Sequence, residues 1–266
     1  MSARHAGLVA FALSAGFALA GQPAAAQYGA VDGEWRSYAG DNGSTKYSPL
    51  DQIDAGNFSD LRIAWRWQSV DGNVDLESLP RRADDRPISI RGLQATPLMI
   101  DGVLYLSTAL YQAAAVDAGT GETIWVHDPR AYDGGDPTHG YRSRGLADWS
   151  DGNDARIFWG TSEAYLIAVD ARTGEPVRDF GDNGRVDLME GVPRADRGGT
   201  NYQGRNLVGV ASPPVITRDV VVTPTIISDF VIRREAPPGW VKGVDARTGD
   251  VRWVFRTIPQ ADDFGA

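Results

Sequence analysis

Four polar side chains in this 266-residue chain are of types that bind small molecules or metal ions: Gln94, His139, Arg144 and Asp229. The Arg144 guanidinium is permanently charged, and its forked N–H groups match paired carbonyl or carboxylate oxygens. Asp229 offers a carboxylate oxygen of the kind that a hard cation such as Ca²⁺ or Mg²⁺ prefers. Each also has a plainer interpretation, because arginine forms ion pairs with nearby aspartates and the other three residue types are common in solvated loops and at strand ends.

The composition excludes several kinds of site and partner. The chain contains no cysteine, so it has no disulfide, no thiolate metal site and no Cys-x-x-Cys-His haem attachment. Its formal net charge of −9 disfavours nucleic acid and anionic lipid as partners. The counts of 31 glycines, 15 prolines and 8 tryptophans are typical of an all-β domain with many turns.

Residues 1–26 have the features of a secretory signal peptide. A basic start with Arg4 precedes an apolar run over 6–20, and three alanines over 24–26 form a small-residue cleavage site. The apolar run is too short to span a bilayer, and no later segment is apolar enough to do so. We therefore expect cleavage after the last of these alanines, export to the periplasm, and a mature chain of residues 27–266 without a membrane span.

A sequence repeat organises the rest of the chain. The motif Ala-x-Asp-x-x-Thr-Gly occurs over 115–121 and 168–174, and a softened copy covers 243–249. Apolar residues lead into each aspartate and glycine frees the backbone at the bend, so each copy predicts two strands joined by a tight turn. The tryptophan that follows a copy is expected to dock on the small residues of a neighbouring unit. Arg178 replaces this tryptophan after the second copy, so we expect that unit to pack less tightly.

The segment before the first copy completes one structural unit. Apolar runs over 98–100 and 103–107 flank Asp101-Gly102, one of the strongest short-range hairpin signals. With the first repeat they give four short antiparallel strands in about thirty residues, the content of one propeller blade. The polar stretch 71–91 is predicted to be a loop between blades. The sequence therefore predicts an all-β fold, a β-propeller of four-stranded antiparallel blades.

The runs over 34–50 and 61–67 carry a family resemblance. They resemble the N-terminus of the quinoprotein dehydrogenases, pyrroloquinoline quinone (PQQ) enzymes of the glucose and alcohol dehydrogenase type. The resemblance extends from Trp35 to Ala266 and implies an eight-bladed propeller with tryptophan-docking repeats. Eight blades need on the order of 500 residues, so the chain is expected to cover about half of the ring. The family's catalytic base is then expected beyond Ala266, and no catalytic residue is named in this chain.

The resemblance also implies roles for the four side chains. Gln94 matches a polar residue that points from the start of a blade toward the quinone, and Arg144 matches an arginine that reaches the quinone oxygens. A guanidinium there would stabilise the reduced, more anionic quinone. His139 fits the glucose dehydrogenase type, since members of the alcohol type carry a disulfide of adjacent cysteines at this place. Asp229 matches an acidic ligand of calcium or magnesium.

The function implied by the resemblance is that of a periplasmic PQQ-dependent dehydrogenase. Such an enzyme, here of the glucose dehydrogenase type, would oxidise an aldose or an alcohol and pass electrons to ubiquinone or a cytochrome. Two alternatives stay open: a non-catalytic propeller scaffold of the cell envelope, and an inactive truncated fragment. The repeats alone do not separate these possibilities, because scaffolds keep the docking pattern without quinone ligands. The joint presence of Gln94, Arg144 and Asp229 favours the enzyme.

Overall fold

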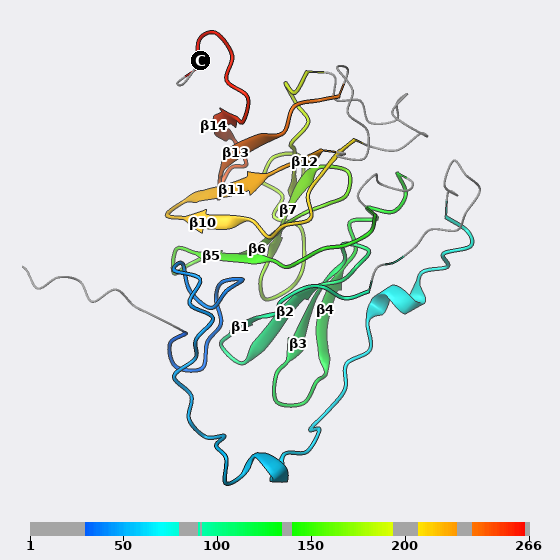
Figure 1. Ribbon diagram of the computed structural model, residues 1–266. Helices are drawn as coiled ribbons and strands as arrows, with labels where there is room; N and C mark the ends of the chain where they lie inside the picture. Colours follow the sequence, from blue (N-terminus) through cyan, green and yellow to red (C-terminus); the bar gives the residue numbers. More distant parts are fainter. Residues whose placement is uncertain are drawn as a thin grey trace, which may run out of the picture.

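The computed structural model describes residues 30–79, 90, 92–134, 140–193, 207–227 and 236–263. Within these ranges the fold is all-β, as predicted, and most strands form three four-stranded antiparallel sheets that follow one another along the chain (Figure 1). The first sheet contains β1 (Leu98–Ile100), β2 (Val103–Ser107), β3 (Ala113–Asp117) and β4 (Thr123–His127). The second contains β5 (Ala147–Ser150), β6 (Ala155–Gly160), β7 (Tyr165–Asp170) and β8 (Arg185–Asp187).

The third sheet completes the series. It contains β10 (Val215–Thr217), β11 (Val220–Pro224), β13 (Trp240–Asp245) and β14 (Val251–Arg256). A separate short pair joins β9 (Val208–Gly209) to β12 (Ile226–Ile227), and two 3-10 helices, η1 (Phe58–Asp60) and η2 (Val70–Asn73), precede the first sheet. The first strands of the second and third sheets, β5 and β10, lie next to each other (Figure 1). The predicted four-stranded antiparallel blades, forming part of a ring, are confirmed.

The turns explain why particular residues recur in the sequence. Asp101 and Gly102 join β1 to β2 with φ of +50° and +79°, which confirms the predicted hairpin. In each repeat the aspartate ends the third strand of a sheet. Its Oδ1 atom accepts hydrogen bonds of 2.7–3.0 Å from the backbone N–H groups two and three positions later, in all three copies. This side chain closes the turn in place of a backbone carbonyl.

Tryptophans dock between neighbouring units, as the repeats predict. Trp125, at the centre of β4, donates a 2.9 Å hydrogen bond from Nε1 to the Ala171 carbonyl of the second repeat. Its ring covers Gly174, where φ is +72° and an added Cβ would lie 2.7 Å from ring atoms. Trp65 docks on the first repeat in the same way, through the Ala118 carbonyl at 3.0 Å. Small residues recur in the motif because an indole ring lies directly on them.

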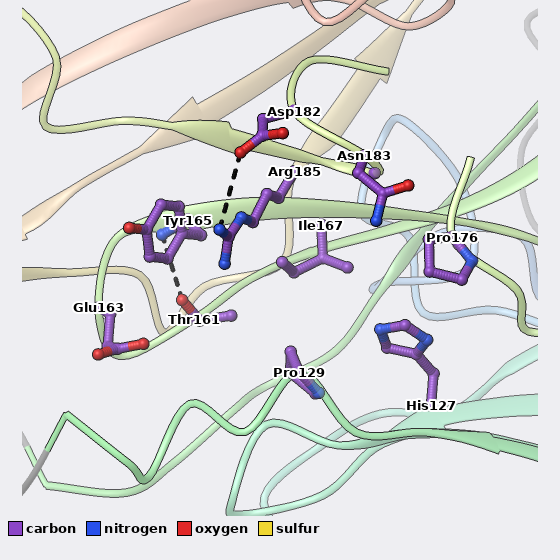
Figure 2. A pocket seen from close by; sticks show the side chains of 11 residues that line it. His127, Pro129, Thr161, Glu163, Tyr165, Ile167, Pro176, Asp182, Asn183 and Arg185 are labelled. Carbon is purple, nitrogen blue, oxygen red and sulfur yellow. Dashed lines mark hydrogen bonds and ion pairs between the residues drawn. The ribbon is translucent and has the colours of Figure 1, made fainter. Parts of the chain in front are cut away.

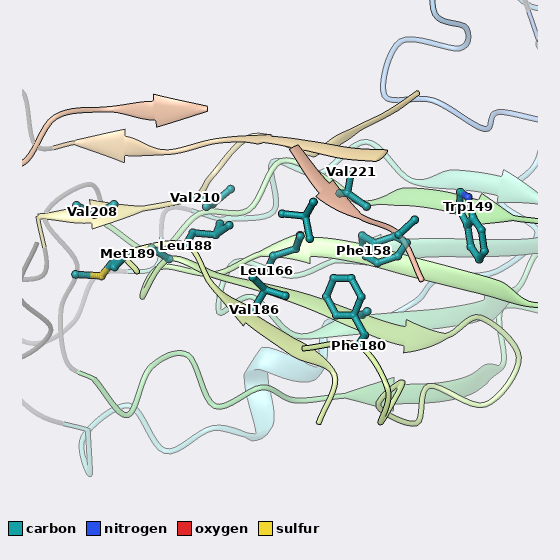
Figure 3. Close-up of a cluster of buried hydrophobic side chains, with 14 residues drawn as sticks. Trp149, Phe158, Leu166, Phe180, Val186, Leu188, Met189, Val208, Val210 and Val221 are labelled. Carbon is teal, nitrogen blue, oxygen red and sulfur yellow. The ribbon is translucent and has the colours of Figure 1, made fainter. Parts of the chain in front are cut away.

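The interface between the second and third sheets uses a different contact. The Gly181 backbone N–H donates a 2.9 Å hydrogen bond to the Thr248 carbonyl, next to Gly249, so backbone lies where the other units have a tryptophan. Phe180 is fully buried beside Phe158, and both belong to a hydrophobic cluster that includes Val221 of the third sheet (Figure 3). The second unit, which carries Arg178 in place of a docking tryptophan, is therefore closely packed against the third sheet, contrary to our expectation.

A buried carboxylate anchors the loop that precedes the first sheet. Asp71 in η2 is 9% exposed, and its Oδ1 atom accepts hydrogen bonds from Thr108 Oγ1 at 2.6 Å and Gln112 Nε2 at 3.0 Å. Its Oδ2 atom accepts from the Leu110 backbone N–H at 3.3 Å. The predicted polar loop is thus attached, at its start, to the turn between β2 and β3. Hydrogen bonds to a carboxylate of this kind are worth more than neutral ones.

Removing this anchor should destabilise the protein. We expect Asp71→Ala to lower the free energy of unfolding by about 1–3 kcal/mol, because it leaves three buried donors of the turn without their acceptor. Glu77→Ala removes the same charge from an exposed position of the same loop and should change stability by less than about 0.5 kcal/mol. Urea unfolding measures the free energy of unfolding of both variants. Equal losses of stability would show that Asp71 acts only through its charge.

Candidate functional site

Three segments that lead into the first strands of the sheets run side by side. The Thr96 backbone N–H donates to the Arg144 carbonyl at 3.1 Å, and Thr96 forms a parallel bridge with Gly145. On the other side, the Arg144 N–H donates to the Ala211 carbonyl at 3.0 Å. The segment that carries Arg144 therefore lies between the segment that leads into β1 and the one that leads into β10, and both of its backbone polar groups are used.

A groove of about 920 Å³ opens beside this segment. Its walls come from β5 with the residues just before it, from β10 with the residues just before it, and from the N-terminal stretch 36–44. Residues that line it include Arg36, Tyr38, Arg144, Asp148, Pro213 and Ile216. A volume of this size falls within the range of small-molecule and cofactor sites. Arg144, a site residue predicted from the sequence, therefore lies in the wall of a groove large enough for a small ligand.

The two arginines of the groove differ in their partners. Arg36 forms ion pairs with Glu34 at 2.9 Å and with Asp148 at 3.2 Å, so its charge is neutralised within the protein. Burial raises the pKa of the Asp148 carboxyl, although the Arg36 guanidinium opposes the shift. Arg144 is half-buried, and no carboxylate among the residues that the structure describes lies within ion-pair distance of it. The ion-pair interpretation of Arg144 therefore finds no carboxylate partner among these residues, and its binding of a ligand stays a prediction.

Of the other three predicted site residues, the structure describes only Gln94. Gln94 is exposed, lies two residues before Thr96, and does not line the groove. It is close in the chain to the backbone pairing with Arg144, and its contact with a cofactor stays a prediction. His139 and Asp229 lie outside the described residues, as does the predicted signal peptide. Within the described ranges no group of three or more His, Asp or Glu side chains is arranged to hold a metal ion.

Arg36 and Asp148 are two residues of the groove that the sequence does not point to. Arg36 falls in the stretch 34–50 and Asp148 follows the Arg144 motif, and nothing in the local pattern pairs residues so far apart in the chain. The structure joins them because the N-terminal stretch bridges to β1 through Trp35 and Met99. This contact brings the N-terminal stretch against the first two sheets and closes one side of the groove.

A second cavity of about 330 Å³ lies at the end of β4, beside β7 and β8 (Figure 2). The His127 ring enters it from one side, and Arg185 lies over the Tyr165 ring at 5.1 Å on the other. His127 Nδ1 is 2.9 Å from the Gly174 carbonyl, and the imidazole meets the Trp159 ring edge-on. Of the predicted site residues, the structure describes Gln94 and Arg144, and neither lines this cavity.

His127 should make stability depend on pH. Burial lowers the pKa of its imidazole, so the folded state takes up a proton less readily than the unfolded state, where the pKa is about 6.5. Stability is then constant above about pH 6.5 and falls below it, until the pH reaches the lowered folded-state pKa. His127→Gln should remove this fall. Thermal unfolding between pH 7.5 and 5 measures this fall in stability. Plots of Tm against pH that run parallel for the variant and the wild type would contradict the prediction.

Comparison with known proteins shows the family to which the chain belongs. Residues 35–265 match the family model PQQ, described as glucose/ethanol/alcohol dehydrogenase, beta-propeller domain. The chain belongs to the quinoprotein dehydrogenase family. This quinoprotein chain is 30% identical over 255 residues to quinoprotein glucose dehydrogenase A of Acinetobacter calcoaceticus, covering 89% of the chain and 30% of the relative. It is 31% identical to quinohemoprotein alcohol dehydrogenase ADH IIB of Pseudomonas putida, covering 85% of the chain and 26% of the relative.

A solved structure supports the same assignment. The quinoprotein chain superposes on the crystal structure of quinohemoprotein alcohol dehydrogenase from Comamonas testosteroni with a TM-score of 0.62 and 25% identity, over 85% of the chain and 27% of that protein. It thus spans about a quarter to a third of the length of the relatives it matches. In the described part of the quinoprotein, no helix has the length and apolar character needed to cross a membrane.

Proposed function

We propose that this chain is part of a periplasmic PQQ-dependent dehydrogenase of the glucose dehydrogenase type, which oxidises an aldose or an alcohol, and that the groove beside β5 and β10 holds the quinone. The observation that carries the proposal is Arg144, a half-buried guanidinium in the groove wall without a carboxylate partner among the described residues. The relatives named above include both glucose and alcohol dehydrogenases, so the choice between sugar and alcohol rests on His139 and the absence of cysteine.

The residues of the groove fit an anionic quinone. PQQ carries carboxylates and adjacent quinone oxygens, and an arginine fork donates to such oxygen pairs. The net charge of the chain is −9, so the protein as a whole repels an anion. Arg144, which has no carboxylate partner in the described part of the chain, is the cation that favours anion binding in the groove. Gln94 adds an amide donor near the start of the first sheet. Asp229 supplies, in this proposal, a carboxylate oxygen for Ca²⁺ or Mg²⁺.

The chain's own residues would act mainly by binding and orientation. When bound, PQQ supplies the two-electron acceptor for oxidation of a substrate hydroxyl. Arg144 donates N–H groups to the cofactor, and its positive charge favours the form with more negative charge. Its backbone is fixed on both sides by Thr96 and Ala211, so the guanidinium approaches from a set direction. No catalytic base is assigned to residues of this chain. In this proposal the electrons pass from the cofactor to ubiquinone or a cytochrome.

Reconstitution of the full-length protein tests this proposal. The protein, purified without cofactor, is titrated with PQQ and CaCl₂, and dye-linked oxidation of glucose and ethanol is measured. We expect activity only when PQQ is present, glucose as the better substrate, and loss of activity on treatment with EDTA that CaCl₂ restores. Absence of PQQ binding would overturn the proposal and favour a non-catalytic propeller or an inactive fragment. Activity with ethanol alone would move the protein to the alcohol type.

A further inference from the structure

Tyr38 is a half-exposed aromatic residue in the wall of the groove that contains Arg144. It belongs to the N-terminal stretch 36–44, which lies beside β5 (Figure 1) and forms one side of the groove. The residue is 46% exposed, a large fraction for an aromatic side chain in a cavity wall. Aromatic side chains are common in the walls of small-molecule sites, where their faces pack against the ligand. The ring of Tyr38 is therefore available to a molecule that enters the groove.

The backbone around Tyr38 is fixed by contacts within the chain. The Trp35 N–H donates to the Met99 carbonyl of β1 at 2.8 Å, and the Trp35 carbonyl accepts from the Met99 N–H at 3.0 Å. The Gly40 N–H donates to the Ser37 carbonyl at 3.0 Å, which closes a tight turn around Tyr38. An added Cβ on Gly40 would lie 3.2 Å from the Trp35 ring. The turn is thus attached to the first sheet, and a ring fixed in advance loses little freedom when a ligand binds.

Tyr38 approaches the arginine segment at Gly145, the residue that directly follows Arg144. A Cβ added to Gly145 would lie 3.7 Å from Tyr38 Cδ2. The same Cβ would lie 3.6 Å from Pro213 Cβ, and Pro213 also lines the groove. Two apolar rings from distant parts of the chain therefore approach the backbone next to Arg144. The cationic and the apolar parts of the groove wall are neighbours.

These two parts of the wall suit two different parts of a flat quinone. The fork of the Arg144 guanidinium binds oxygen atoms at the edge of a ring system and leaves the faces of that system to other groups. The face of a fused aromatic ring system is largely apolar, and it packs favourably against a second aromatic ring in an offset stack. Tyr38 supplies a ring of this kind beside the arginine.

We propose that Tyr38 is a cofactor-contact residue, whose ring covers one face of PQQ while Arg144 binds oxygen atoms at its edge. This inference rests on the proposed function, because PQQ is the ligand that the groove is proposed to hold. The contribution belongs to the ring of Tyr38 and not to its hydroxyl, since stacking uses the aromatic face. The N-terminal stretch then serves cofactor binding as well as the packing of the first two sheets.

Fluorescence titration of the full-length protein, purified without cofactor, tests the inference. PQQ dissociation constants, from quenching of tryptophan fluorescence, are measured for wild type, Tyr38→Phe and Tyr38→Ala. We expect Tyr38→Ala to weaken PQQ binding about tenfold, the size of a stacked aromatic contact. Tyr38→Phe keeps the ring and should stay within about twofold of wild type. Tyr47→Ala removes a tyrosine that is 58% exposed and does not line the groove, and it should leave PQQ affinity unchanged.

The titrations separate the role of Tyr38 from the proposed function. Unchanged affinity in Tyr38→Ala would overturn the stacking role and leave the function intact. Equal losses in Tyr38→Phe and Tyr38→Ala would assign the effect to the hydroxyl and also overturn stacking. Wild-type protein that binds no PQQ would overturn both proposals. Should circular dichroism show that Tyr38→Ala does not fold, Tyr38→Leu replaces it, because leucine keeps apolar volume without an aromatic face. Wild-type affinity in that variant would overturn the inference.

Discussion

Arg144→Ala is expected to weaken PQQ binding by about 100-fold, or about 3 kcal/mol, the larger end of what a hydrogen bond to a charged group contributes. The reason is the isolation of this guanidinium. It lies half-buried in the groove wall, and the described part of the chain offers it no carboxylate. Its removal therefore takes away an interaction with the ligand and disrupts no ion pair within those residues. Equilibrium titration of the full-length protein with PQQ measures the effect.

Two matched variants sharpen this prediction. Arg144→Lys keeps the charge but loses the forked geometry, so we expect a loss of about tenfold, between wild type and the alanine variant. Arg130→Ala removes an exposed arginine whose charge is already paired with Asp133 at 2.7 Å, and PQQ affinity should not change. Equal affinities for Arg144→Ala and Arg130→Ala would show that Arg144 does not bind the cofactor.

Trp125→Ala is expected to lower the free energy of unfolding by about 3–5 kcal/mol, the usual cost of deleting a large buried aromatic side chain. The indole is 8% exposed, covers Gly174 and donates to the Ala171 carbonyl. Its loss opens a cavity between the first and second sheets and leaves the carbonyl without this donor. Urea unfolding of the full-length protein, followed by tryptophan fluorescence and circular dichroism, measures the change.

A neighbour on the same strand provides the control. Ile124 precedes Trp125 in β4 and is 50% exposed, so Ile124→Ala should cost less than about 1 kcal/mol. Gly174→Ala tests the other half of the contact, since its new Cβ would lie 2.7 Å from the Trp125 ring and its φ is positive. Wild-type stability in Trp125→Ala would contradict the docking account, and a stable Gly174→Ala would contradict the close approach of ring and backbone.

The parts of this fold that the sequence predicts correctly depend on local chemistry. Asp101-Gly102 gives a hairpin because both residues adopt positive φ, and the aspartate of each repeat closes a turn with residues two and three positions away. Tryptophan docking follows from the same repeats, since glycine leaves room for a ring. These features need no knowledge of distant contacts, so inspection of the sequence finds them.

The parts that the sequence does not predict depend on contacts between distant segments. Asp71 looks like one more polar loop residue, and only the fold brings it to the turn at Leu110 and Gln112. The pairing of Arg36 with Asp148 also joins distant segments, at a sequence separation of 112. The motif around Arg144 points to this residue, whereas only the structure shows that none of the described carboxylates pairs with it. The roles of Gln94, His139 and Asp229 stay predictions.

The central claim is that the groove beside β5 and β10 binds PQQ through Arg144, and a crystal structure of the full-length protein with PQQ tests it most directly. We predict the quinone in that groove, with Arg144 N–H groups within hydrogen-bond distance of its oxygens. PQQ bound elsewhere, for example in the smaller cavity beside His127, would contradict the claim. So would a saturated complex in which Arg144 contacts only protein carboxylates.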